Sequence, residues 1–402
     1  MNRPTAAPRP TQPSRAAPRP ILPPATIGIL GGGQLGRMLA LAARQLGYRI
    51  AVLDPDPDCP AAGVADRVVV GRYDDIVAGL ELASGSDVVT VELEHVGWEL
   101  LARLEREWPV RPAVDTVRVT QNRLEERRFL EANGAAVTPW REVQSSFDLE
   151  AAVEQLGLPL RLKAATGGYD GRSQVRIPGP ADVESALARL GRPDGEPLVA
   201  ELELDFEAEL SVVCSRSVDG RAVTFPVARN RHDEGILVES STPAAISSSV
   251  AETATELARR LAEGFALVGT LTVELFLMPD GSLIVNELAP RVHNSGHWTI
   301  EGTATSQFEQ HIRAICELPL GSVEPRAGGM ATVNLLGTGP LREARPAGID
   351  DALAMPDVHV HLYDKRRVFE RRKMGHVTAV GSTVDEALGR ARAAAAKIRW
   401  EP

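Results

Sequence analysis

The sequence contains 402 residues, of which 44% are hydrophobic and 24% are charged, so it is long enough for two or three globular domains. Its formal net charge of −10 argues against a nucleic-acid partner, because phosphate backbones are bound by a surplus of lysine and arginine. The three cysteines are scattered, no run of 18 or more apolar residues occurs, and the N-terminus lacks the apolar core of a signal peptide. We therefore expect a cytoplasmic protein without a membrane partner.

Residues 1–25 differ in composition from the rest of the chain, with eight prolines, four arginines and no acidic residue. A segment of this kind has too little apolar surface to become ordered by itself. We predict a disordered tail, and a basic interaction arm is the alternative.

The next segment alternates apolar runs with helical spacing, and a glycine-rich turn separates the first run from a helix. We predict strands at 26–30, 49–54, 68–70 and 87–91 and a helix at 37–44. Strands that alternate with helices predict a parallel, doubly wound sheet, here in an N-terminal α/β domain over residues 26–118.

The glycine-rich turn fits a known nucleotide-binding pattern. Gly31, Gly33 and Gly36 match G-x-G-x-x-G, and Asp54 follows at about the distance expected for an acid that binds a ribose. The same glycines serve any tight turn from strand to helix, so an NAD-dependent oxidoreductase is only one of the interpretations that this turn allows.

A second unit begins with a charged helical pattern near residues 119–135. Within it, Lys163 ends a predicted strand and leads into the glycine-rich turn 166–174, which a strand follows at 175–177. Backbone N–H groups of such a turn and the lysine ammonium can bind phosphates, and an ordinary hairpin turn beside a solvated lysine is the alternative. We predict further antiparallel strands at 197–204, 207–214 and 224–228, a polar loop at 229–235 and a helix at 250–267.

Two strands at 271–278 and 282–287 meet at a hairpin turn that contains Asp280-Gly281. If this dipeptide is a two-residue loop, Glu274 lies directly opposite Glu287, with Cβ atoms about 5 Å apart. Like charges at that distance repel, and a shared Mg²⁺ ion would resolve the conflict. The alternative is that one acid is protonated or solvated. Strict alternation sends Asn286 to the opposite face of the sheet.

The hairpin runs into a polar loop over residues 286–299. Pro290 and Gly296 prevent a continuous helix, so we expect the loop side chains to point into a cleft and bind an anionic cosubstrate. These side chains are Arg291, His293, Asn294, Ser295 and His297. A zinc site of Glu287 and the two histidines is an alternative, although no helix aligns the histidines and no cysteine joins them.

The last part of the chain contains a predicted strand at 331–337 and a basic segment. Six lysines or arginines lie between residues 365 and 373 of this acidic protein. They form either a solvated run of charge or a phosphate site in a small C-terminal domain over 321–402.

Five strings together resemble the ATP-grasp superfamily, and within it the family of 5-(carboxyamino)imidazole ribonucleotide synthetases of purine biosynthesis. They are GGGQLGRM (31–38), VELEHV (91–96), TGGYDGR (166–172), NELAPRVHNSGHWT (286–299) and RKMGHVT (372–378). The resemblance implies an α/β ATP-grasp architecture: an N-terminal doubly wound parallel sheet, a central α+β ATP-grasp domain with antiparallel sheets over 119–320, and a small C-terminal domain.

The resemblance also implies which residues bind the ligands. The ATP site would contain phosphate ligands, a flexible loop, an adenine hinge and ribose ligands, namely Arg123, Lys163, Gly168, Tyr169, Asp170, Gly171, Arg172, Ser173, Gln174, Glu201, Leu202, Glu203, Leu204, Glu209, His232, Asn286 and Glu287. Glu274 and Glu287 would bind Mg²⁺, with Mn²⁺ as an alternative ion. The ribonucleotide would contact Gln34, Glu94, Tyr169, Asp170, Arg291, His293, Asn294, Ser295, Lys365 and Arg372.

The implied reaction is an ATP-dependent carboxylation of aminoimidazole ribonucleotide by bicarbonate, through carboxyphosphate. Lys163, Arg291 and His293 would be the catalytic residues, and the enzyme would be a homodimer. Under this interpretation the glycine turn frames the ribonucleotide and binds no NAD. The alternatives are another ATP-grasp ligase, such as a formate-using transformylase or a biotin carboxylase-like subunit, and a nucleotide-binding regulator without turnover.

The chain departs from the family pattern at several positions. Ser173 replaces a glycine, Arg161 an apolar residue, Asn122 an aspartate and Arg127 a lysine, and Phe369-Glu370-Arg371 replaces Arg-Pro-Gly. We expect these changes to affect loop flexibility and one phosphate contact.

Overall fold

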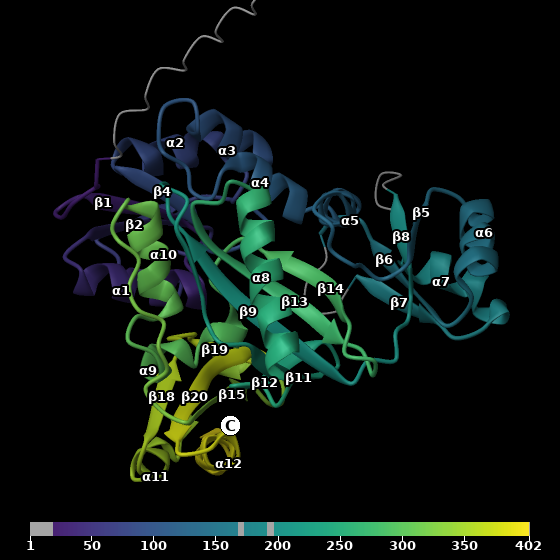
Figure 1. The fold of residues 1–402 in the computed structure, drawn as a ribbon. Helices are drawn as coiled ribbons and strands as arrows, with labels where there is room; N and C mark the ends of the chain where they lie inside the picture. The colour runs from purple at the N-terminus through teal and green to yellow at the C-terminus, as the bar shows by residue number, and fades with distance from the viewer. Residues whose placement is uncertain (1–18, 168–172, 191–196, 402) are drawn as a thin grey trace, which may run out of the picture.

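The computed structural model describes residues 19–167, 173–190 and 197–401 (Figure 1). Most of the expected tail and the loop residues Gly168, Tyr169, Asp170, Gly171 and Arg172 lie outside the described residues. The expectation that disorder extends to residue 25 is wrong. The backbone N–H of Ile21 donates to the Cys316 carbonyl at 3.0 Å, and the Tyr48 hydroxyl donates to the Ile21 carbonyl at 2.6 Å.

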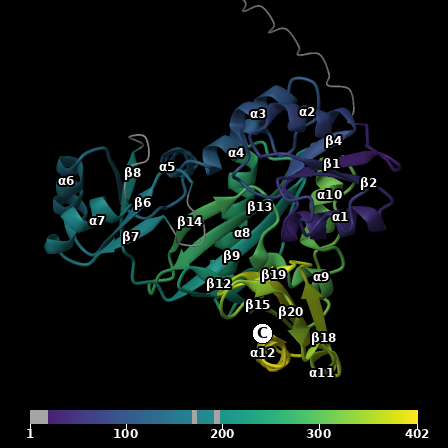
Figure 2. The same ribbon diagram turned by 180° about the vertical axis from the view of Figure 1, so that it is seen from behind.

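The N-terminal segment forms a parallel sheet with the strand order β3-β2-β1-β4, as predicted. Its elements are β1 (Thr26–Leu30), α1 (Gln34–Gln45), β2 (Arg49–Asp54), β3 (Arg67–Val70), α2 (Ile76–Ser84), β4 (Val88–Val91), α3 (Trp98–Leu104) and α4 (Val114–Thr120). Helix α1 packs on one face and α2 to α4 on the other, so the sheet is doubly wound. Helix α10 (Gln307–Ile315), from much later in the chain, lies beside α1 (Figure 2).

A separate lobe contains a second, antiparallel sheet with the order β5-β8-β6-β7 (Figure 1). Its elements are α5 (Arg123–Ala132), β5 (Trp140–Val143), α6 (Ser146–Leu156), β6 (Leu160–Ala164), β7 (Gln174–Ile177), α7 (Val183–Leu190) and β8 (Leu198–Leu202). Strands β6 and β7 pair antiparallel with Lys163 opposite Gln174, so the strands on both sides of the predicted phosphate-binding turn are confirmed.

The largest sheet has nine strands in the order β14-β13-β9-β11-β12-β15-β20-β18, with β10 attached to β9. They are β9 (Ala208–Arg216), β10 (Ala222–Thr224), β11 (Ala228–Asp233), β12 (Ile236–Thr242), β13 (Gly269–Leu277), β14 (Leu283–Ala289), β15 (Gly329–Leu336), β18 (Val358–Leu362) and β20 (Lys373–Gly381). The predicted polar loop at 229–235 is wrong, because most of it is strand β11. The C-terminal strands β15, β20 and β18 continue the central sheet.

The remaining elements surround this sheet. They are α8 (Ser248–Gly264), the short helix at Asn294–Gly296, α9 (Thr299–Gly302), β16 (Arg342–Glu343), β17 (Pro346–Ala347), α11 (Ile349–Leu353), β19 (Arg367–Val368), α12 (Val384–Ala395) and β21 (Arg399–Trp400). None of the helices in the described part of the chain combines the length and apolar character needed to cross a membrane.

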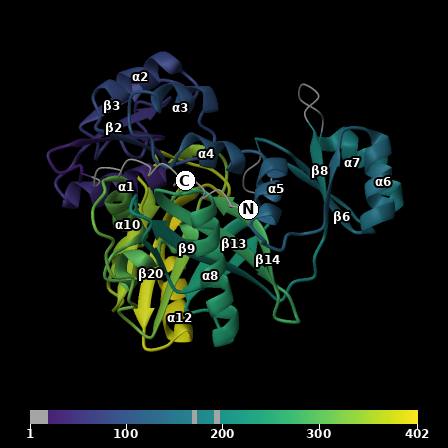
Figure 3. The same cartoon turned by 45° about the horizontal axis from the view of Figure 1, so that its top comes forward.

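Helix α8 lies across β9 and β13 (Figure 3). It covers one face of these strands, so the side chains on that face are buried in the core. Leu271, Val273 and Leu275 of β13 pack beneath it in the core. Because side chains alternate along a strand, Glu274 projects from the opposite face. That face is left for polar groups.

Candidate active site

The β13–β14 hairpin places Glu274 directly opposite Glu287, which confirms the predicted pairing. The predicted two-residue loop is wrong. The Met278 N–H donates to the Ser282 carbonyl at 2.9 Å, so three residues form the loop, and Gly281 takes a left-handed φ of 83°. Pro279 favours the type I turn that such a loop contains.

A β-bulge restores the pairing that the longer loop would otherwise shift. Leu275 pairs with Val285, and the register changes between Glu274 and Leu275, so Asn286 is the extra residue. Glu274 therefore meets Glu287 although the loop has three residues. The bulge also removes the conflict over Asn286, because strict alternation does not hold there.

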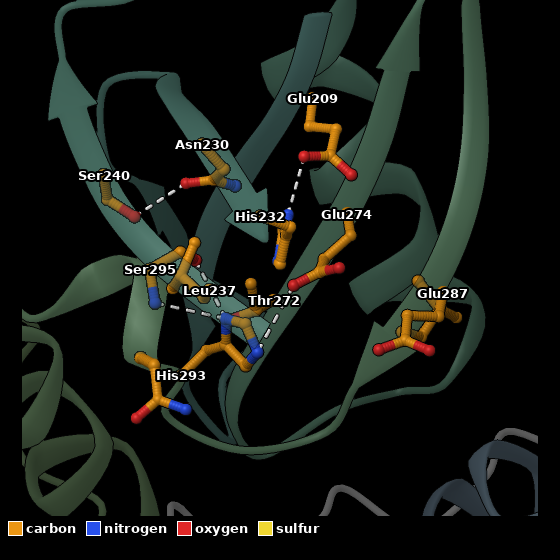
Figure 4. Close-up of polar contacts among 12 residues, drawn as sticks. Glu209, Asn230, His232, Leu237, Ser240, Thr272, Glu274, Glu287, His293 and Ser295 are labelled. Carbon is orange, nitrogen blue, oxygen red and sulfur yellow. Dashed lines mark hydrogen bonds and ion pairs between the residues drawn. The ribbon is translucent and has the colours of Figure 1, made fainter. Parts of the chain in front are cut away.

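Glu274 lies in a partly buried cluster of titratable side chains (Figure 4). Burial, and next the charge of Glu287, raise the pKa of Glu274 to about 7. His293 Nε2 lies 3.3 Å from a Glu274 oxygen, and the Ser295 N–H donates to His293 Nδ1 at 3.3 Å. Since Nδ1 is the acceptor, neutral His293 carries its proton on Nε2, which points at Glu274.

His293 is neutral because burial, and next the charge of Arg291, hold its pKa well below the ordinary value. On the other side of Glu274, His232 Nδ1 lies 2.7 Å from a Glu209 carboxylate oxygen (Figure 4). The neighbouring strands β14, β13, β9 and β11, with the loop after β14, thus bring three carboxylates and two imidazoles to one face of the sheet.

The predicted phosphate ligand Lys163 is buried in an ion-pair cluster. Its ammonium donates to a Glu201 oxygen at 2.5 Å, and Arg127 Nε donates to the other oxygen at 2.9 Å. Burial lowers the pKa of Lys163 and by itself would raise that of Glu201, but the charges of Arg127 and Lys163 hold the Glu201 pKa at about 2. Glu201 therefore fixes both cations.

Glu126 is a site residue that sequence reasoning missed. It is buried and accepts the Leu288 N–H at 2.5 Å, which fixes β14 one residue after Glu287. Burial raises the Glu126 pKa to about 7, against the opposing charge of Arg127. Arg123 reaches Glu287 at 3.7 Å. In the sequence, Glu126 is one of several acidic residues in a charged helix, so no sequence pattern distinguishes it as a site residue.

The predicted ribonucleotide ligands come from all three parts of the chain. Arg291 forms an ion pair with Glu94 at 2.8 Å, and the Gln34 amide contacts Asn294 at 3.3 Å. The Lys365 ammonium donates to Gln34 at 2.6 Å. The structure therefore brings these five residues into one region.

Two basic residues of the C-terminal segment differ in their relation to this region. Arg372 donates to the Arg367 carbonyl at 2.6 Å and lies over the Phe369 ring, and burial lowers its pKa. Lys373 was not among the predicted ligands, yet its charge helps to lower the pKa of His293, after burial and Arg291. A basic segment gave no signal of which lysine would face the site.

His297 does not point into a cleft, contrary to expectation. Its ring is fully buried and stacks on His376 with ring centroids 4.6 Å apart, because β20 lies behind the loop. His297 Nε2 contacts Asn294, whereas His293 turns toward Glu274. The zinc alternative fails on this geometry, and no group of three or more potential metal-ligating side chains occurs within 19–167, 173–190 and 197–401.

The glycine-rich turn is filled by the protein itself. Glu92, which follows β4, accepts the N–H of Gly33 at 2.6 Å and that of Gly36 at 2.5 Å. A Cβ on Gly33 would lie 2.4 Å from a Glu92 oxygen. The backbone donors that would hold a pyrophosphate in a dinucleotide site are therefore occupied by a buried carboxyl group.

We expect no saturable binding of NADH, because the Glu92 carboxyl group occupies the backbone donors of the turn and leaves none for a pyrophosphate. Titration of the protein with NADH, followed by nicotinamide fluorescence, measures this binding. Added ADP is the control, because it displaces any NADH that is bound at the ATP site. Saturable NADH binding that ADP does not displace would restore the dinucleotide interpretation.

Several departures from the family pattern have structural explanations. Arg161 and Arg176 both form ion pairs with Glu203 at 2.6 Å, and the Asn122 side chain caps α5. Arg371 forms an ion pair with Asp233, the last residue of β11 and the neighbour of His232. Ser173 accepts the Ala164 N–H at 3.0 Å through its carbonyl, a contact that any residue can make.

Comparison with known proteins gives three family matches along the chain. The Ribonucleotide synthetase preATP-grasp domain matches residues 24–121, the ATP-grasp domain 128–308, and the Phosphoribosylaminoimidazole carboxylase C-terminal domain 331–390. The N5-carboxyaminoimidazole ribonucleotide synthase of Bacillus subtilis (strain 168) is 42% identical over 366 residues, covering 91% of this chain and 94% of the relative.

Solved structures agree with these matches. The ADP complex of an N5-carboxyaminoimidazole ribonucleotide synthetase superposes with a TM-score of 0.86 and 43% identity, covering 94% of this chain and 97% of the other. The Aspergillus clavatus enzyme in complex with ADP and 5-aminoimidazole ribonucleotide superposes with a TM-score of 0.84 and 34% identity, covering 92% and 97%. The chain belongs to the N5-carboxyaminoimidazole ribonucleotide synthase family of ATP-grasp enzymes.

Proposed function

We propose that this chain is an ATP-dependent carbon–nitrogen ligase that carboxylates the exocyclic amine of 5-aminoimidazole ribonucleotide. ATP and bicarbonate are the cosubstrates, and ADP and phosphate are released with the carboxylated ribonucleotide. The observation that carries the proposal is the pairing of Glu274 with Glu287 directly before the loop that holds Arg291 and His293. The strand that carries Glu287 therefore leads directly into residues 290–299, which contain the proposed substrate ligands and are called the substrate loop below.

ATP is held between the lobe of β5 to β8 and the large sheet. In this proposal Lys163 and Arg123 contact the phosphates, the segment from Glu201 to Leu204 contacts adenine, and Glu209 binds the ribose hydroxyls, with His232 lining the same pocket. The contact of Glu209 with His232 at 2.7 Å supports the last assignment, because it orders both side chains before the nucleotide binds. Lys163 must exchange part of its contact with Glu201 for a phosphate oxygen, and Arg127 can keep Glu201 compensated.

The donor set at the hairpin fits Mg²⁺. Glu274 and Glu287 supply hard carboxylate oxygens from two adjacent strands, and the raised pKa of Glu274 reflects its burial and the nearby charge of Glu287. These two residues would hold the ion, with Asn286 beside them at the bulge. When bound, the ion would neutralise charge on the ATP phosphates.

The catalytic residues act on the transferred phosphoryl group. Bicarbonate oxygen attacks the γ-phosphorus and the bond to the β-phosphate oxygen breaks, which yields carboxyphosphate and ADP. Arg291 and His293 stabilise this intermediate, with the Nε2 proton of neutral His293 available as a donor. The substrate amine then forms the new C–N bond and phosphate leaves. Exclusion of water matters because carboxyphosphate hydrolyses readily.

The remaining parts of the proposal concern the whole protein. We propose domains at 26–118, 119–320 and 321–402, a homodimer and a cytoplasmic location. Likeness to the family supports these assignments.

The test of the proposed function is ADP release by the purified protein with ATP and Mg²⁺. Aminoimidazole ribonucleotide, bicarbonate and formate are added singly and together. We expect full release only with the ribonucleotide and bicarbonate together. Release that ignores the ribonucleotide would reject the proposal in favour of another ATP-grasp ligase, and binding of ATP without release under any condition would indicate a regulator.

A further inference from the structure

Asn294 lies at the centre of a series of hydrogen bonds that joins helix α1, the substrate loop and α10. Its Oδ1 atom is 3.3 Å from Gln34 Nε2 and 3.1 Å from His297 Nε2. Within the described parts of the chain, no hydrogen bond uses Asn294 Nδ2 as the donor. The side chain is nearly buried, with 9% of the residue exposed. Its orientation therefore decides which group the site presents.

Lys365 fixes which atoms donate and which accept at one end of this series of hydrogen bonds. An ammonium group can only donate, so Gln34 Oε1 is the acceptor of the 2.6 Å contact with Lys365. The Gln34 amide nitrogen then faces Asn294 and can only donate. Asn294 must consequently turn its oxygen, and not its nitrogen, toward Gln34.

At the other end, contacts of Gln307 with the backbone of His293 fix the donors and acceptors independently. The His293 N–H donates to Gln307 Oε1 at 3.0 Å, so the Gln307 amide nitrogen is the donor to the His293 carbonyl at 2.7 Å. The same nitrogen lies 3.5 Å from His297 Nδ1, which makes Nδ1 an acceptor. A neutral His297 then carries its proton on Nε2 and donates it to Asn294.

We propose that His297 is a positioning residue for the ribonucleotide site. Together with Gln34 it holds the Asn294 oxygen inward, so that both N–H groups of the Asn294 amide face the substrate and donate to an acceptor oxygen or nitrogen on it. The inference rests on the proposed function, because it names the role of a residue in that same site.

The surroundings of His297 suit this role. Its ring stacks on His376, and burial, followed by the charges of His361 and Lys373, lowers the His297 pKa to about 3. A neutral ring has one donor and one acceptor, and both are used by the chain. A protonated ring would place a second N–H against the Gln307 amide nitrogen and break the order of donors.

The experiment compares His297→Leu with His297→Gln in the full-length enzyme. Leucine removes the donor, whereas the glutamine amide can replace Nε2. We expect the KM for aminoimidazole ribonucleotide to rise about tenfold in His297→Leu and to stay within about twofold of wild type in His297→Gln. The KM for ATP should remain within about twofold in both variants, because none of these hydrogen bonds involves a residue proposed to bind ATP.

A second variant keeps the test decisive if His297→Leu does not fold. Gln34 is only partly buried, and Gln34→Glu retains the acceptor for Lys365 but sets a carboxylate oxygen against Asn294. We expect it also to raise the ribonucleotide KM about tenfold. Two results would overturn the positioning role of His297. One is an unchanged KM for the ribonucleotide in Gln34→Glu, and the other is an equal rise of this KM in His297→Gln and His297→Leu. Absence of ribonucleotide-dependent ADP release in the wild type would instead reject the proposed function.

Discussion

Glu287→Gln is expected to lower ADP release by about 10²–10³-fold while the protein stays folded. The change removes one of the two opposed carboxylates and replaces a charged oxygen ligand by a neutral amide. Glu287 is partly exposed on its side chain, so the packing around it tolerates an isosteric amide. Steady-state ADP release at saturating ATP, Mg²⁺, bicarbonate and ribonucleotide measures the loss.

The matched control is Glu252→Gln on the exposed surface of α8, where the same chemical change should leave ADP release unchanged. Thermal unfolding of both variants checks the fold. In the ligand-free protein, removal of the Glu287 charge should also weaken the repulsion of Glu274, so a small rise in stability is expected. Near-normal turnover in Glu287→Gln would refute the metal-binding role of the hairpin.

Arg127→Met is expected to lower the free energy of unfolding by about 3–5 kcal/mol, because it leaves a buried carboxylate with one partner instead of two. Arg127 has a fully buried side chain, and Glu201 is 3% exposed. Chemical denaturation at pH 7 measures the change. Arg128→Met is the control, because the neighbouring arginine is 52% exposed and its surface ion pairs should contribute no more than about 1 kcal/mol.

The difference between Arg127→Met and wild type should depend on pH in a definite direction. The folded-state pKa of Glu201 is about 2, below the unfolded value of about 4.3. Its ionisation therefore stabilises the wild type above pH 4.3, and this contribution is lost as the pH falls toward 2. The two unfolding free energies should converge over that range. A constant difference would show that Arg127 acts through packing and not through the charge of Glu201.

Local patterns were sufficient for the N-terminal sheet and for about half of the antiparallel strands. Alternation of strands and helices predicted the parallel sheet, and apolar runs predicted β6 to β9 and β13 to β15, whereas β5, β12, β18 and β20 were not predicted. The strand expected at 224–228 is wrong, because residues 225–227 lie between β10 and β11. The composition of residues 229–235 resembles that of a loop because β11 carries charged residues at its exposed positions. Ile21 was assigned to the tail because its anchors, Tyr48 and Cys316, come from distant parts of the chain.

The site shows the same division more sharply. The pairing of Glu274 with Glu287 was predicted from a two-residue loop, and it holds because a three-residue loop and a bulge at Asn286 offset each other. A bulge is a backbone feature that leaves side-chain periodicity almost unchanged, so the sequence pattern could not reveal it.

The sequence by itself determined the family-specific strings, the parallel N-terminal sheet and the residue types that gather at the substrate loop. Only the tertiary structure decided which of those residues face a ligand: β20 covers His297, Glu92 fills the glycine turn, and Glu126 supports the strand after Glu287. Each of these contacts joins residues far apart in the chain. Burial and hydrogen-bond direction depend on such neighbours, whereas strand and helix propensity depend on residues nearby in sequence.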